Sequence, residues 1–154
     1  MSPEEFKAAL SRWVTGVTVI TTRSRSGEIA GLTASSFTSV SLEPPLVLFC
    51  LAHVSTSKSA FDAADGFVVN VLGESQRALS GGFARQGGDK FAGVGWRPGL
   101  RGMPLIDDAL AQLECRIVQR HPGGDHTIVV GEVERVDVRE DLPLAYYRGA
   151  YRSI

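Results

Sequence analysis

The chain has few of the features that mark secreted, membrane or zinc-binding proteins. It has only 2 cysteines in 154 residues, Cys50 and Cys115, and both lie in apolar or alternating segments, without the spacing of a disulfide framework or a zinc site. No apolar run approaches the roughly 20 residues that span a bilayer, and the N-terminus SPEEFKAALSRW is acidic and amphipathic, unlike a signal peptide. We therefore expect a soluble protein of a reducing, cytoplasmic compartment, with no membrane partner.

Neither sign of charge is in excess. The 16 Lys and Arg residues nearly balance 17 Asp and Glu residues, for a formal net charge of −1. A nucleic-acid partner usually requires a basic face, so none is expected. The 17 glycines and 7 prolines fall below the share typical of low-complexity chains. The length predicts a single domain over residues 1–154.

Sequence motifs of covalent, metal and Rossmann-type chemistry are also missing. There is no G-x-S-x-G, H-E-x-x-H or C-x-x-C, and the three histidines, His53, His121 and His126, are scattered. No metal site is expected. The glycines of GVGWRPG do not have the spacing of a dinucleotide-binding fingerprint and follow no predicted strand, which excludes a Rossmann domain.

The patterns that are present predict a mainly β protein with a few short helices. Ser2, Pro3 and Glu5 form a capping-box signature that begins a helix. β-Branched strands follow, and the apolar run LVLFCLA at 46–52 predicts a strand buried on both faces. Two short helices are expected near 58–64 and 76–83, a glycine-rich loop over 85–102, and a hairpin from 113 to 138 around the turn HPGGD. This order favours a closed or nearly closed antiparallel barrel.

Two segments have a composition that suggests ligand binding. In GLTASSFTSVS, the small residue Ala34 leaves space for a flat ring, and Thr33, Ser35 and Ser36 offer polar groups to its edge. An edge strand with a solvated Ser/Thr face explains this composition about equally well. The second segment, Ser55-Thr56-Ser57-Lys58, begins a predicted helix, where free N–H groups and a lysine attract an anion.

Ordinary N-capping is the stronger interpretation of this second segment taken alone. The two segments are separated by a single predicted strand, however, and together they suit a phosphorylated heteroaromatic cofactor.

At this level of detail the chain resembles a known family. Six segments are similar to segments of the short-chain flavin reductases and occur in the same order. They are GLTASSFTSVSLEPPLV, STSK, FVVNVL, GDKF, GDH and YYRGAY. These FMN-binding split-barrel enzymes supply reduced flavin to two-component monooxygenases. The resemblance implies an antiparallel split β-barrel of Greek-key type, a homodimer, and reduction of FMN, FAD or riboflavin by NADH or NADPH.

The resemblance also implies roles for individual residues. It assigns flavin contacts to Thr33, Ala34, Ser35 and Ser36, with Leu51 and Ala52 nearby, phosphate contacts to Ser57 and Lys58, and a flavin-covering segment to Phe83, Asp89, Lys90 and Phe91. His126 of the GDH turn corresponds to the nicotinamide side of the site. A turn histidine without a role is the simpler explanation from the residues alone.

The expected function is that of an NAD(P)H:flavin oxidoreductase with a partner monooxygenase. Two alternatives stay open: a non-catalytic flavin-storage or flavin-sensing module, and an oxidase similar to pyridoxine phosphate oxidase. A barrel of this size has its interior filled by side chains, so a flavin must lie outside it. We expect a second copy of the chain to cover the flavin.

Overall fold

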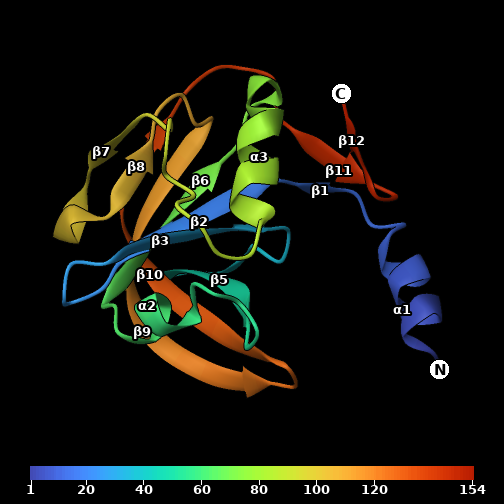
Figure 1. Ribbon diagram of the computed structural model, residues 1–154, viewed down its shortest axis with the longest axis horizontal. Helices are drawn as coiled ribbons and strands as arrows, with labels where there is room; N and C mark the ends of the chain where they lie inside the picture. Colours follow the sequence, from blue (N-terminus) through green and yellow to red (C-terminus); the bar gives the residue numbers. More distant parts are fainter.

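The computed structural model describes all residues, 1–154, and is organised around one antiparallel sheet (Figure 1). The seven strands of this sheet are arranged in the order β3-β2-β6-β9-β10-β5-β4. Their bounds are β2 Thr18–Arg23, β3 Ile29–Ala34, β4 Thr38–Leu42, β5 Pro45–Ala52, β6 Gly66–Val71, β9 Ala111–Gly123 and β10 His126–Val138.

The sheet has two edges, β3 and β4, which are consecutive in the chain. Residues 35–37 carry the chain from one edge to the other, and no ladder joins the two strands. The barrel is thus split, in agreement with the predicted fold class.

Smaller elements surround this sheet. A three-stranded sheet is formed by β1 Thr15–Gly16, β11 Ala145–Tyr147 and β12 Ala150–Arg152, and a two-stranded one by β7 Trp96–Pro98 and β8 Pro104–Ile106. The helices are α1 Pro3–Leu10, α2 Lys58–Asp62 and α3 Arg77–Ala84, with 3-10 turns η1 Glu74–Gln76 and η2 Leu100–Gly102. None of the helices has both the length and the apolar composition needed to span a bilayer.

The first helix begins as its capping signature predicts. Ser2 Oγ accepts a hydrogen bond from the Glu5 amide at 3.1 Å, and the Glu5 carboxylate accepts one from the Ser2 amide at 2.7 Å. No residue of α1 is buried, although Phe6 and Leu10 lie one turn apart on the same side. Figure 1 shows α1 extending away from the main sheet beside β11 and β12. The apolar side of α1 is therefore unpartnered within the chain.

The predicted long hairpin is also present. Strands β9 and β10 pair over most of their length and turn at Gly124 and Asp125, where Gly124 has a φ of 65°. Between Val130 and Gly131 the register shifts by a bulge. A side chain at Gly131 would collide with the ring of Phe67, 2.6 Å from an ideal Cβ, so the close approach of the strand to the core requires glycine.

Strand β5 corrects one prediction. Val47, Phe49 and Leu51 are buried, whereas Leu46, Leu48, Cys50 and Ala52 are only half-buried. The expectation of burial on both faces is wrong because one face packs on the core, in contact with Phe61 and Phe67, and the other lines an open surface. A continuous apolar run does not show whether its second face meets protein or a ligand.

A buried polar network fixes β8 against the main sheet. The Asn70 amide group donates to the Val19 carbonyl and to Thr21 Oγ1, both at 3.1 Å, and its oxygen accepts from the Ile106 amide and from Gln112 Nε2, both at 3.0 Å. Asn70 is fully buried, and all its polar atoms are hydrogen-bonded. Such a satisfied network fixes the position of the neighbouring chain.

Candidate functional site

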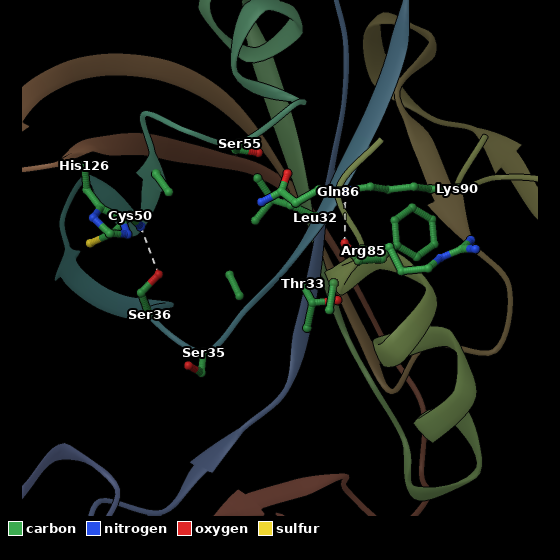
Figure 2. A pocket seen from close by; sticks show the side chains of 14 residues that line it. Leu32, Thr33, Ser35, Ser36, Cys50, Ser55, Arg85, Gln86, Lys90 and His126 are labelled. Atoms are coloured by element: carbon green, nitrogen blue, oxygen red, sulfur yellow. Dashed lines mark hydrogen bonds between the residues drawn. The ribbon is translucent and has the colours of Figure 1, made fainter. Parts of the chain in front are cut away.

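A cleft of about 280 Å³ opens beside the split between β3 and β4 (Figure 2). Its walls come from β3, β5, the segment before α2, the end of α3 and the loop that follows, and the first residue of β10. The lining residues are Leu32, Thr33, Ala34, Ser35, Ser36, Cys50, Ala52, Ser55, Phe83, Ala84, Arg85, Gln86, Lys90 and His126. Segments distant in sequence thus meet in one cleft.

Most of the predicted flavin contacts lie here. The cleft brings together Thr33, Ala34, Ser35, Ser36, Ala52, Phe83, Lys90 and His126. Ala34, which the sequence suggested would leave space for a ring, and Ala52 each contribute only a methyl group to the wall. Figure 2 shows Cys50 and His126 at one end of the cleft and Arg85 and Lys90 at the other. The arrangement offers a shelf of small residues between two polar ends.

Five predicted residues lie outside this cleft. Leu51 points into the core, where it is 1% exposed. Ser57 Oγ donates to the Gly31 carbonyl at 3.0 Å, and Lys58 forms an ion pair with Asp62 one turn along α2. These two polar groups, predicted to hold a phosphate, are engaged by the protein itself.

A smaller cavity of about 170 Å³ adjoins the cleft. It is lined by Ser57, Asp89 and Phe91 among others, and it shares Lys90 with the cleft. The flavin-covering segment expected from the resemblance therefore lies between two cavities, and Lys90 reaches both.

Six lining residues were not among the predicted contacts: Leu32, Cys50, Ser55, Ala84, Arg85 and Gln86. Cys50 lies two residues before the predicted Ala52, so strand alternation places both on one face and offered a usable signal. Gln86 offered none, because its position depends on a distant contact. Its side-chain oxygen accepts from the Thr56 amide at 3.2 Å, and Thr56 Oγ1 accepts from the Gly87 amide at 3.0 Å.

Lys90 fastens the loop after α3 to the sheet. Its Nζ donates to the Gly31 carbonyl on β3 and to the Phe83 carbonyl on α3, both at 3.1 Å. Partial burial, with a smaller contribution from the positive charge of Arg85, holds the pKa of Lys90 below its usual value. The lysine therefore positions the loop and also places a positive charge at the edge of the cleft.

The hydroxyl groups of the cleft differ in what they can still bind. Thr33 Oγ1 donates to the Ser80 carbonyl at 2.6 Å, so it retains only acceptor capacity. Ser36 Oγ accepts from the Cys50 amide at 3.0 Å and keeps its own proton to donate. Ser35 is exposed and makes no side-chain hydrogen bond within the protein. Ser35 and Ser36 are therefore available as donors to a bound molecule.

His126 is oriented by its neighbour in the hairpin turn. Its Nδ1 lies 2.7 Å from the carboxylate of Asp125, and the hydrogen bond to His126 lowers the pKa of Asp125. The Asp125 carbonyl also accepts from the His53 amide at 2.9 Å, which ties the turn to the end of β5. This arrangement holds the imidazole at the rim of the cleft.

The charges of the lining suit an anionic ligand. Arg85 and Lys90 contribute positive charge to the cleft, His126 contributes an imidazole, and no Asp or Glu residue lines it. The small residues, free hydroxyls and basic side chains together fit a flat polar ring that carries a phosphate.

Comparison with known proteins identifies the family. Residues 10–154 match the family described as "Flavin reductase like domain". The protein is a flavin reductase family member. It is 43% identical, over all of its own length and 83% of the relative's, to the "Flavin-dependent monooxygenase, reductase subunit HsaB" of Mycobacterium tuberculosis.

Two solved structures of similar sequence, one of them that of an NADH:FAD oxidoreductase, have the same fold. A structure from Sinorhizobium meliloti 1021 superposes with a TM-score of 0.95 at 40% identity and covers 99% of this chain, which spans 54% of that longer protein. The "NADH:FAD oxidoreductase SgcE6" of Streptomyces globisporus C-1027, in complex with NAD and FAD fragments, has a TM-score of 0.92 at 36% identity and covers 100% of this chain and 95% of its own. The predicted family, fold class and enzyme class, an NAD(P)H-dependent flavin reductase, are confirmed.

Proposed function

We propose that this flavin reductase oxidises NAD(P)H, reduces FMN or FAD bound in the cleft, and delivers the reduced flavin to a partner monooxygenase. The observation that carries the assignment to the cleft is its lining, in which small residues lie between basic groups and no carboxylate is present. The reductase subunits among its relatives support the role in a two-component system.

The flavin supplies the hydride-accepting chemistry, so the protein needs no nucleophile or metal. Ala34 and Ala52 leave space for the ring, and Ser35 and Ser36 offer donors to its polar edge. Arg85 and Lys90 attract the negative charges of the phosphate and of the reduced ring. We place the phosphate toward these two residues, because both line the cleft, whereas Ser57 and Lys58 do not.

His126 is proposed to act on the nicotinamide side. It lies at the end of the cleft away from Lys90, and Asp125 fixes its ring through Nδ1. This leaves the other ring nitrogen free to hydrogen-bond an incoming carboxamide. Its role is to orient the nicotinamide against the flavin, since hydride transfer needs the two rings stacked at close range.

We also propose that the working unit is a homodimer over the single domain 1–154. The cleft is open, and α1 together with the turn after it presents Phe6, Leu10 and Trp13 at 50%, 56% and 76% exposure. An apolar side of this kind is costly in water and is typical of an interface. A second copy packed there would remove it from water and exclude solvent from the flavin.

The assay for the activity is NAD(P)H oxidation with and without added FMN or FAD. We expect oxidation only with flavin, saturating as the flavin concentration rises. Tight flavin binding with negligible turnover would instead identify a storage module, and oxygen consumption with a pyridoxine phosphate and no nicotinamide would identify an oxidase. Either result would overturn the proposal.

The dimer is tested by analytical ultracentrifugation of the wild type and of Trp13→Asp. We expect a dimer for the wild type and a shift toward monomer, with lower activity, for the variant. A fully active wild-type monomer would contradict the dimer. We assign the protein to the cytoplasm, an assignment supported by two free thiols that form no disulfide.

A further inference from the structure

A second polar cavity lies at the opposite end of the β2–β3 hairpin from the flavin cleft. Its volume is about 410 Å³, and its seven lining residues include none that is hydrophobic: Arg23, Ser24, Arg25, Ser26, Gly27, Asp65 and Arg101. It shares no residue with the flavin cleft, whose first lining residue, Leu32 on β3, is five residues after Gly27. Without an apolar wall it offers nothing for an aromatic ring to stack on, so a ligand here must be compact and polar.

Arg23 is the unusual member of this cavity. Its guanidinium forms no ion pair and no side-chain hydrogen bond in the structure. The Arg23 side chain lies close to two glycines, Gly27 and Gly102. A Cβ atom added to Gly27 would be 3.5 Å from Nη2 of Arg23, and one added to Gly102 would be 3.3 Å from Nη1.

Both glycines have a positive φ, 96° at Gly27 and 69° at Gly102, which other residues rarely adopt. The exposed Arg23 side chain thus lies beside two glycine turns with its guanidinium unpaired. The free N–H donors of this planar group match the oxygens of a phosphate.

Two further arginines, Arg25 and Arg101, line the same cavity, and each forms an ion pair with a carboxylate. Arg25 pairs with Asp65 at 2.7 Å, and Arg101 forms a two-pronged pair with Glu134 at 2.8 and 3.0 Å. Among the lining residues, three arginines are opposed by the single carboxylate of Asp65. With Glu134 counted as the partner of Arg101, one positive charge is left unbalanced, that of Arg23.

We propose that this cavity is an anion site that binds a small phosphorylated molecule through Arg23, with Arg25 and Arg101 beside it. The unpaired, planar guanidinium of Arg23 favours an ion with several oxygens, and the positive charges of Arg25 and Arg101 lie on the same cavity. The volume exceeds what one bare ion fills, so a diphosphate or a phosphate ester suits it. The site is separate from the flavin cleft, and both can be filled at once.

The test is calorimetric titration of inorganic pyrophosphate into the full chain saturated with FMN, at constant ionic strength. FMN keeps the probe from the basic end of the flavin cleft. We expect one pyrophosphate per chain, an affinity at least about tenfold weaker in Arg23→Gln, and an intermediate loss in Arg23→Lys, which keeps the charge but not the fork. The matched control is Arg152→Gln, an exposed arginine on β12 outside every cavity described, which should bind as the wild type does.

Two more measurements keep the result interpretable. In ¹⁵N-resolved spectra, pyrophosphate should move the amides of Ser26, Gly27 and Gly102, and melting temperatures should show that Arg23→Gln is folded. Binding that Arg23→Gln and Arg152→Gln weaken equally would reveal nonspecific attraction and overturn the proposal. So would the absence of heat and of amide shifts up to about 10 mM pyrophosphate, a concentration at which even millimolar affinity is detected. Neither outcome bears on the reductase activity, which has its own assay.

Discussion

Replacing Lys90 by Met tests whether the loop after α3 is part of the flavin site. The substitution keeps the length of the side chain but removes its charge and both hydrogen bonds, to the carbonyls of Gly31 and Phe83 at 3.1 Å. These two hydrogen bonds are the ones by which the Lys90 side chain connects the loop to β3 and to α3. We expect the loop to detach from β3 while the sheet stays folded.

The size of the effect follows from those two contacts. A hydrogen bond from a charged donor contributes about 1.5–3 kcal/mol. Lys90 is only half-buried, so water can partly replace each bond when it is lost, and we take about half of that value for each. The total is about 1.5–3 kcal/mol, which corresponds to about a 10- to 100-fold weaker flavin affinity. Global stability should fall less, because the loop can open locally.

The measurement is the flavin dissociation constant, together with the KM for flavin in the NAD(P)H assay. Arg152→Met, which removes a positive charge at an exposed position on β12, is the control and should leave flavin affinity unchanged. Urea unfolding of both variants reports global stability. Flavin affinity within about twofold of the wild type in Lys90→Met would refute the reasoning, since it would mean that the two bonds contribute almost nothing to the cleft.

Four other outcomes are expected. His126→Ala should raise the KM for NAD(P)H about 2- to 10-fold, the loss of one hydrogen bond, with flavin affinity nearly constant; an unaltered nicotinamide KM would count against the role. Asn70→Leu should lower the free energy of unfolding in urea by about 3–5 kcal/mol, because its four hydrogen-bond partners lie in the core. Burial raises the pKa of Cys115 to about 12, so at mildly alkaline pH a thiol reagent should modify only the half-buried Cys50 in the folded protein, more slowly with flavin bound, and both thiols after unfolding. Because the unfolded thiol ionises near pH 9 and the folded one does not, the Cys115 contribution to stability should fall as pH rises from about 9 towards 12, a trend that Cys115→Ala should abolish.

The features that depend on neighbouring residues were predictable from the sequence. The capping box of α1 needs only Ser2, Pro3 and Glu5, and the β9–β10 hairpin needs alternation on both sides of a glycine turn. The resemblance added the split of the sheet and most of the cleft lining. These parts are encoded by short-range patterns or by motifs with a fixed order.

The features that depend on distant contacts were not predictable. The start of a helix at Lys58 was expected, but the carbonyl that engages Ser57 belongs to Gly31, 26 residues away. Gln86 enters the cleft because of its bond to Thr56, 30 residues earlier. Whether Ser57 and Lys58 contact a phosphate stays a prediction. The third case is the burial of β5. Both faces of this strand are apolar, so its composition does not show that one face packs on the core and the other lines the cleft.

The alternation of β5 separates two kinds of mutational change within one strand. Phe49 and Leu51 sustain the core, while Cys50 and Ala52 shape the cleft on the opposite face. If the flavin binds in the cleft as proposed, we expect substitutions at positions 50 and 52 to alter which flavin fits with little loss of stability, and substitutions at 49 and 51 to destabilise the core. Cofactor preference can therefore change through substitutions on the open face of β5 while the core is preserved. A mutant library limited to positions 50 and 52 is suited to selecting such a change.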